Sequence, residues 1–163
     1  MGSMKSSNIR FATESDLDII IKYIKELAAY EKMTDNVRLQ PELVKQHLFS
    51  EKPFAEAIIA ELDGVDVGFA LFFSTYSTFE GKPGIHLEDL FITPEARGNG
   101  LGKAMLQFLA NETVKRGGAR FEWTCLDWNQ PSIDFYESQG AKCLNDWLIF
   151  RMDGKTLQDF ASL

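Results

Sequence analysis

Residues 87–103 read Leu-Glu-Asp-Leu-Phe-Ile-Thr-Pro-Glu-Ala-Arg-Gly-Asn-Gly-Leu-Gly-Lys, and most of what this chain reveals follows from them. An apolar, strand-like run comes first and a glycine-rich turn follows it. A helix-periodic run, Ala104 to Ala110, comes next. Glycines let a backbone approach a ligand closely, and a helix start presents free N–H groups and a positive dipole end. The stretch therefore predicts a strand, a turn and a helix that bind a phosphate group.

The spacing of the turn excludes two common phosphate loops. In a Walker A loop, Arg97 would occupy the first glycine position. In a dinucleotide fingerprint, Lys103 or Met105 would stand where the third glycine belongs. What remains is the pattern Arg-x-x-Gly-x-Gly, formed by Arg97, Gly100 and Gly102.

A second segment adds to this pattern. From Asn129 onward the chain reads Asn-x-x-Ser-x-x-Phe-Tyr-x-x-x-Gly. Together the two segments resemble the GNAT superfamily of acetyl-CoA-dependent N-acetyltransferases. The resemblance implies an α/β fold, with a mixed, mostly antiparallel central sheet flanked by helices. It also implies a homodimer and acetyl-CoA as cosubstrate, bound by Leu90, Phe91, Ile92, Arg97, Gly98, Asn99, Gly100, Leu101, Gly102, Lys103, Asn129, Ser132 and Tyr136.

Within that family the tyrosine at the position of Tyr136 faces the sulfur of acetyl-CoA. A phenol suits the role of general acid, because its pKa of about 10 keeps it protonated near neutral pH, whereas a thiol has a pKa of about 8.5. The alternative is that Tyr136 only packs its helix. Asn129 and Ser132 likewise have a structural alternative as capping residues of the same helix.

Three segments, 26–31, 87–91 and 128–132, narrow the resemblance to the diamine (spermidine/spermine) N-acetyltransferase branch, which also contains thialysine acetyltransferases. The likeness implies an amine site that is lined by Tyr30, Glu31, Glu88 and Asp89, with Trp123 as a further candidate wall. Carboxylates suit a polyamine because each protonated nitrogen favours an anionic partner. The attacking nitrogen must first lose a proton, and Glu88 is the candidate base, directly or through a water.

Two features leave the acceptor open. Adjacent strand residues point to opposite faces, so Glu88 and Asp89 cannot share a cleft without a bulge or a strand end; we favour Glu88 as the functional one. The tight Asp63-Gly64 turn and the short 142–147 segment depart from the animal diamine enzymes, which puts the far end of the substrate channel in doubt.

Composition sets outer limits. The 163 residues predict one acetyltransferase domain over 1–163, with Met1-Gly2-Ser3 as a cloning scar.

A net charge of −7 disfavours nucleic acid as a partner and favours a cationic substrate, although an acidic chain is also more soluble. The sequence contains no apolar run long enough to predict a membrane span. It also contains no Cys, His and Asp cluster that predicts a metal site. Cys125 and Cys143 predict buried free thiols in a cytoplasmic protein, and neither has an activating pattern.

Periodicity predicts alternating elements. Asp63-Gly64 predicts a type I′ hairpin, and Thr13 with Asp16 predicts a capping-box-like helix start. The expected strands are 9–12, 54–62, 65–73, 84–92, 119–126, 141–144 and 147–152, and the expected helices are 17–30, 41–48, 98–116, 131–139 and 155–160.

The sequence therefore predicts an N-acetyltransferase in which a primary amine, of a polyamine or diamine, attacks acetyl-CoA directly. One alternative is a lysine-like amino acid of the thialysine type, or another small amine, as acceptor. Two others are a non-catalytic sensor that binds acyl-CoA and a protein-interaction module without enzymatic activity.

Overall fold

The computed structural model describes residues 5–163, so the predicted scar at Met1-Gly2-Ser3 lies outside the described residues. The chain divides into two units, one up to Thr124 and one from Cys125 to Leu163, and each is described by itself. The single domain over 1–163 stays a prediction.

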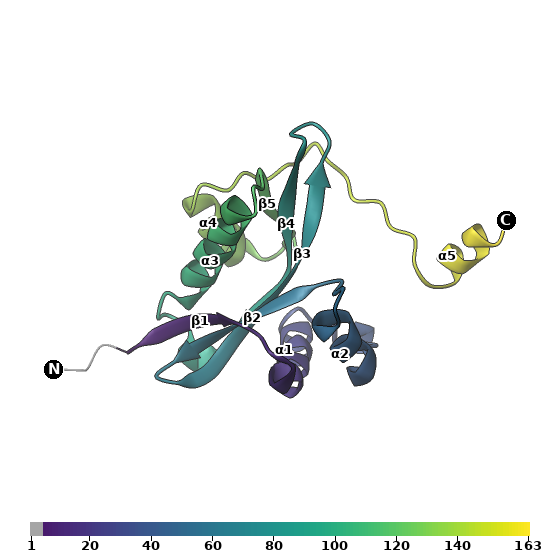
Figure 1. The fold of residues 1–163 in the computed structure, drawn as a ribbon. Helices are drawn as coiled ribbons and strands as arrows, with labels where there is room; N and C mark the ends of the chain where they lie inside the picture. Colours follow the sequence, from purple (N-terminus) through teal and green to yellow (C-terminus); the bar gives the residue numbers. More distant parts are fainter. Residues whose placement is uncertain (1–4) are drawn as a thin grey trace. The chain divides into compact units, whose positions relative to one another are not determined.

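One five-stranded sheet forms the centre of the first unit (Figure 1). Its strands follow one another in chain order, and each pairs antiparallel with the next except β4 and β5, which are parallel. This is the mixed, mostly antiparallel sheet that the sequence predicts. Asp63 and Gly64 have φ values of 53° and 78°, as a type I′ turn requires. The strands are β1 (Ser7–Phe11), β2 (Glu56–Leu62), β3 (Val65–Ser77), β4 (Lys82–Ile92) and β5 (Arg120–Trp123).

Three α-helices cover the two faces of the sheet, with α1 (Leu17–Tyr30) and α2 (Pro41–Phe49) on one side and α3 (Leu101–Lys115) on the other (Figure 1). The first face buries Ile20, Tyr23, Ile59, Phe69 and Phe91 in one cluster, among others. Alternate strand positions such as Ile58 and Phe72 are fully buried as well, and so are Met105 and Leu109 of α3. Each such side chain contributes about 1.5–3 kcal/mol when buried.

The sequence placed the start of α3 at Gly98, which is three residues too early. Gly98 and Gly100 have φ values of 79° and 74°, outside the right-handed helical region, so the helix begins only at Leu101. Short 3₁₀ turns precede three of the α-helices: η1 (Glu14–Asp16), η2 (Thr34–Asn36) and η3 (Pro94–Ala96).

An ion-pair network fixes β1 to the start of α1. The Arg10 guanidinium lies 2.7 Å from Asp16 and 2.8 Å from Glu61. The Thr13 backbone N–H donates to the Asp16 carboxylate at 2.7 Å, as the capping-box pattern predicts. Asp16 is buried, and its hydrogen bonds to Arg10 lower its pKa.

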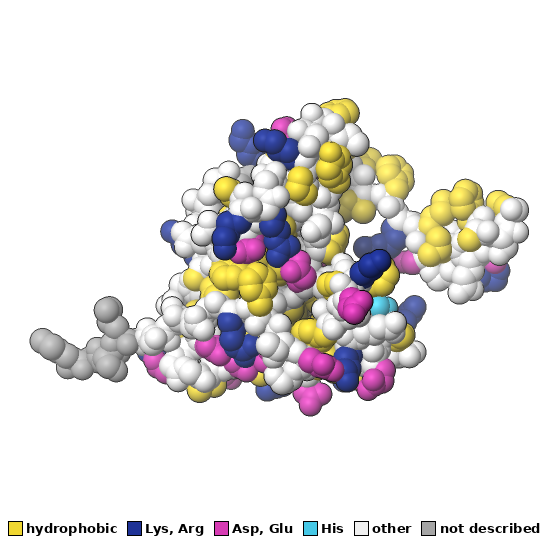
Figure 2. Space-filling model, viewed as in Figure 1, with side chains coloured by type: hydrophobic (Ala, Val, Ile, Leu, Met, Phe, Trp, Pro, Cys, Tyr) yellow, Lys and Arg dark blue, Asp and Glu magenta, His cyan; other side chains and the backbone are white. Residues whose placement is uncertain are grey.

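The second unit contains α4 (Gln130–Ser138) and α5 (Gly154–Ala161). The prediction of strands at 141–144 and 147–152 is wrong, because residues 141–153 form no strand in the described chain. A strand needs a neighbour for its backbone groups, and an apolar pattern does not supply one. Cys125 and Cys143 form no disulfide within the described residues and are exposed, whereas the sequence predicted buried thiols. Figure 2 shows hydrophobic side chains gathered on one side of α5.

Within residues 5–163, no helix is long and apolar enough to cross a membrane. The face in Figure 2 intersperses acidic with basic side chains.

Candidate functional site

A β-bulge at Glu88 is the local feature that builds the site. Leu87 pairs with Phe72 of β3, and Asp89 pairs with the adjacent Leu71, so no β3 residue stands opposite Glu88. A bulge of this kind breaks the strict alternation of side chains between the two faces. The sequence required a bulge or a strand end for Glu88 and Asp89 to share a cleft, and the structure contains the bulge.

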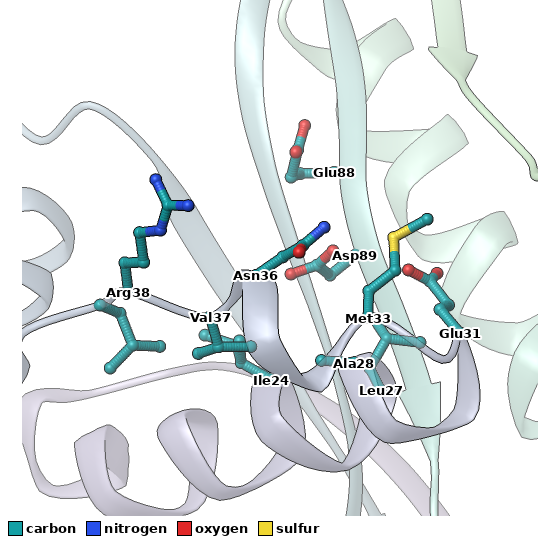
Figure 3. Close-up of a pocket in the computed structure, with 11 residues that line it drawn as sticks. Ile24, Leu27, Ala28, Glu31, Met33, Asn36, Val37, Arg38, Glu88 and Asp89 are labelled. Carbon is teal, nitrogen blue, oxygen red and sulfur yellow. The ribbon is translucent and has the colours of Figure 1, made fainter. Parts of the chain in front are cut away.

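Glu88 and Asp89 line one cavity of about 350 Å³ in the first unit (Figure 3). The C-terminal half of α1 supplies Glu31 and part of an apolar wall, and the segment 33–39 closes the remaining side. The lining residues are Ile24, Leu27, Ala28, Glu31, Met33, Asn36, Val37, Arg38, Leu39, Glu88 and Asp89.

The carboxylates of this cavity repel one another. Burial, with added repulsion from Glu88 and Glu31, raises the pKa of Asp89 to about 6. Burial and the charge of Glu88 also raise the pKa of Glu31. No cation contributes to either shift. Three carboxylates that gather in one site without a cation paired to them favour a cationic ligand.

His86 lies beside the bulge. Its Nε2 atom is 3.8 Å from Oε2 of Glu88, and its ring stacks on Phe73 with a centroid distance of 4.9 Å. The ring is therefore held by packing, and it does not line the cavity. This position fits the structural role that a lone strand histidine usually has.

The glycine turn has the geometry of an anion site. An added Cβ at Gly98 or Gly100 would meet no atom within 4 Å, so the space over the turn is open. The Asn99 side-chain amide donates to the Ala96 carbonyl at 2.9 Å and closes the turn. The first N–H groups of α3, on Leu101, Gly102 and Lys103, have no partner within the helix. The turn therefore fits a pyrophosphate group.

Arg97 fixes the turn against the sheet and α1. Its Nε donates to the Ile92 carbonyl at 3.0 Å, and its guanidinium lies 5.6 Å from the Tyr30 ring and 5.7 Å from the Phe91 ring. Tyr30 was predicted to contact the amine. The structure places it against Arg97 and outside the lining of the cavity.

The edge of β4 is open next to the bulge. β5 pairs only with Gly84 to Leu87 of β4, and it ends at Trp123, opposite Leu87. The strand expected over 119–126 is therefore shorter than predicted. In the first unit as described, no strand lies beside residues 88–92 on this edge. The backbone groups of Leu90, Phe91 and Ile92 include ones that are free for an extended amide ligand. Trp123 stands where the strands part and does not line the cavity.

The second unit carries the other predicted cofactor residues. The Asn129 side chain accepts from the Ser132 backbone N–H at 3.4 Å, so Asn129 caps α4 as the sequence allowed. Ser132 and Tyr136 are four residues apart and share one face of α4. The Tyr136 ring lies 5.7 Å from that of its neighbour Phe135.

Sequence reasoning missed the wall formed by residues 33–39, which includes Met33, Asn36, Val37 and Arg38. This segment has neither helical nor strand periodicity. The one available signal was its position, directly after the helix end that carries Glu31.

Comparisons with known proteins point to one family. Residues 22–141 match the Acetyltransferase (GNAT) family. The chain is 34% identical over 169 residues to thialysine N-epsilon-acetyltransferase from Sus scrofa, covering 97% of this chain and 99% of that protein. It is 29% identical over 202 residues to L-ornithine N5-acetyltransferase from Arabidopsis thaliana, covering 96% and 89%. It is 33% identical over 169 residues to spermidine/spermine N(1)-acetyltransferase-like protein 1 from Homo sapiens, covering 98% of this chain and 24% of that protein.

A solved structure shares the fold. An integron cassette protein from the mobile metagenome of V. cholerae superposes with a TM-score of 0.80 at 24% identity, covering 97% of this chain and 99% of the other. This chain therefore belongs to the GNAT family of acetyltransferases. It is an N-acetyltransferase that resembles the thialysine and spermidine/spermine branch, and acetyl-CoA is the cosubstrate of its family.

Within residues 5–163, no group of three or more His, Cys, Asp or Glu side chains is placed to hold a metal ion.

Proposed function

We propose that this protein transfers an acetyl group from acetyl-CoA to a primary amine of a small acceptor that carries a second charged group, as polyamines, diamines and diamino acids do. The cavity at the β4 bulge carries the proposal. Glu31, Glu88 and Asp89 surround one space, and no cation contributes to the pKa shifts of Glu31 and Asp89. The relatives include a thialysine N-epsilon-acetyltransferase, an L-ornithine N5-acetyltransferase and a spermidine/spermine N(1)-acetyltransferase-like protein, and these support the same acceptor class.

Glu88 is the proposed base. Its side chain is 56% exposed, at the junction of the cavity and the open β4 edge, so it can pass a proton to solvent. An ammonium must lose its proton before it can attack a thioester, and a carboxylate accepts that proton directly or through a water. Tyr136 is the proposed general acid toward the departing thiolate.

Acetyl-CoA is proposed to lie with its pyrophosphate over the turn from Arg97 to Lys103 and its pantetheine along residues 90–92. The open space at Gly98 and Gly100 and the unpaired β4 edge support this placement. Asn129 and Ser132 are proposed further contacts. A backbone N–H of residues 90–92 would hold the developing oxyanion.

The test is an acceptor panel in which CoA release is followed with a thiol reagent. Polyamines, diamines, diamino acids, aminoglycosides and neutral amines are compared. Glu88→Gln should weaken binding of cationic acceptors and displace the alkaline rise of the rate, and Glu31→Gln should raise KM for long polyamines more than for short diamines. Glu51→Gln, an exposed residue outside the cavity, serves as control.

Three outcomes would contradict the proposal. The first is a preference for neutral or anionic acceptors with Glu31→Gln silent, which would overturn the cationic acceptor but leave an acetyltransferase. The second is tight acetyl-CoA binding without thiol release for any amine, which would indicate a sensor. Absence of any thermal shift with acetyl-CoA would favour an interaction module.

Direct transfer makes a separate prediction about the cysteines. Cys125→Ser and Cys143→Ser should both retain activity, because neither sulfur carries the acetyl group. Initial-rate kinetics should show intersecting lines. Ping-pong kinetics, or an acetyl adduct found on either cysteine by mass spectrometry, would rule out the direct route.

We further propose that the protein is a homodimer. Trp147, Leu148, Ile149 and Phe150 are consecutive and each at least 74% exposed, and a second copy could cover them. Sedimentation at micromolar concentration should show a dimer, and a single monomeric species would refute the proposal.

A further inference from the structure

The acidic cavity contains one basic residue, Arg38. It lies on the segment between η2 and α2, and it lines the same cavity as Glu31, Glu88 and Asp89. In Figure 3, Arg38 and Glu31 stand at opposite ends of the labelled residues, with Asn36, Glu88 and Asp89 between them. The cavity therefore has a cationic end and an anionic end.

Arg38 is not used to neutralise the carboxylates. Within residues 5–163, its guanidinium takes part in none of the ion pairs or side-chain hydrogen bonds, and it does not contribute to the pKa shifts of Asp89 or Glu31. Arg10, by contrast, engages Asp16, Glu61 and Asp66. A guanidinium that lines a cavity and is left unpaired is available to an anionic group of a ligand.

The chemistry of the two ends defines the ligand. A guanidinium presents a planar fork of donors that matches a carboxylate in two parallel hydrogen bonds. Arg38 is exposed, whereas Asp89 is half-buried. An acceptor with a carboxylate at one end and ammonium groups at the other would satisfy both ends. A pure polyamine would bring a positive charge toward Arg38.

We propose that Arg38 binds the α-carboxylate of a diamino acid and thereby selects such acceptors over the corresponding decarboxylated diamines. The proposal rests on the proposed function, because it specifies which members of the amine class the cavity prefers. A charge-assisted, two-bond contact of this kind supports a preference of about 10- to 100-fold.

The experiment compares acceptors that differ only in the carboxylate: lysine with cadaverine, and ornithine with putrescine. The measured quantity is the ratio of kcat/KM within each pair. In the wild type the amino acid should be favoured. Arg38→Ala should reduce that ratio about 10- to 100-fold, through a higher KM for the amino acid and an unchanged or lower KM for the diamine. Arg38→Lys should keep part of the preference, because it keeps the charge but loses the fork.

Two controls isolate the contact. Lys52→Ala removes an exposed basic residue of the same unit that does not line the cavity, and it should leave both ratios unchanged. Lysine amide lacks the carboxylate charge. The wild type should therefore use lysine amide about as poorly as Arg38→Ala uses lysine, and Arg38→Ala should use lysine and lysine amide equally well. This arm keeps the test decisive if Arg38→Ala folds poorly.

A wild-type preference for the diamines would overturn the proposal, as would an equal loss of both acceptors in Arg38→Ala. Both results leave the amine acetyltransferase standing, because thiol release with some amine still occurs. Failure of every amine in the panel would overturn the proposed function and this proposal together.

Discussion

Replacing Asp89 with asparagine should stabilise the ligand-free protein at neutral pH while it weakens acceptor binding. The side chain is half-buried, and two further carboxylates, Glu88 and Glu31, repel it. Its ionised form is therefore disfavoured in the folded state. Asparagine keeps the shape and a hydrogen-bonding group but removes the charge, so the folded state no longer has to hold that charge near its neighbours.

The magnitude follows from the pKa. The pKa of Asp89 rises from 3.8 to about 6 on folding, and each unit corresponds to about 1.4 kcal/mol. The ionised carboxylate thus costs the folded state up to about 3 kcal/mol above pH 6, and partial solvent screening reduces the gain expected from asparagine to about 1–3 kcal/mol. For a domain of this size, that gain raises Tm by roughly 3–10 °C.

The pH dependence gives the sign. Because the folded pKa of Asp89 is above the unfolded one, the folded state binds more protons between pH 3.8 and about 6, so the stability of the wild type falls as pH rises through that window. The advantage of Asp89→Asn should therefore be small near pH 4 and complete above about pH 6.

Thermal and urea unfolding of both proteins at several pH values measure this difference. Asp35→Asn, an exposed aspartate outside the cavity lining, serves as the matched control and should show no such window. Calorimetric titration with a cationic acceptor should show weaker binding to Asp89→Asn. A variant that is destabilised, or that differs from the wild type by the same amount at every pH, would refute the reasoning.

Three further predictions concern other parts of the chain. Gly100→Val should abolish acetyl-CoA binding in a titration. Gly117 has a φ of 75°, against 74° for Gly100, and open space around it, so Gly117→Val should impose the same backbone strain but spare binding. Equal affinities in both variants would show that the cofactor does not bind at the turn. Tyr136→Phe should keep acetyl-CoA affinity but lower kcat about 100-fold or more in steady-state assays, with the exposed Tyr76→Phe as control; an unchanged rate would exclude the proton donor. Asp16→Asn should cost about 2 kcal/mol of stability at pH 7 in urea unfolding. Because Arg10 holds the pKa of Asp16 below 3.8, that difference should disappear as pH falls through the folded pKa, and a loss that persists in acid would contradict the ion-pair explanation.

The sequence predicted the sheet wherever local chemistry determined it. Asp63-Gly64 specifies its own turn through two positive φ values, and this turn brings Leu62 of β2 opposite Val65 of β3. The end of β5 at Trp123 could not be predicted in this way. It depends on where a parallel neighbour stops pairing, and no residue of 119–126 encodes that in its own pattern.

The carboxylates of the site could be predicted from the sequence, but the shape of the cavity could not. Glu31, Glu88 and Asp89 were named from a resemblance, and the structure brings them around one cavity. The sequence left open whether a bulge or a strand end would bring Glu88 and Asp89 together. It could not decide between them, because the single extra residue of a bulge leaves no mark in an apolar run. Arg38 was missed because the irregular segment that carries it becomes a wall only when α1 and β4 are in place.

The bulge and the open edge occur at neighbouring residues of one strand, and this has a consequence for transfer. β5 pairs with β4 up to Leu87, and the bulge falls on Glu88. Residues 89–92 continue toward the glycine turn paired with β3 but with no described strand on the β5 side. The same short stretch of β4 thus turns two carboxylates toward the cavity and, under the proposed placement of acetyl-CoA, offers backbone groups to the pantetheine. An acceptor held by Glu88 and a thioester held on this edge would lie within a few residues of each other along β4. Such proximity favours attack of the amine on the thioester without a carrier residue between them.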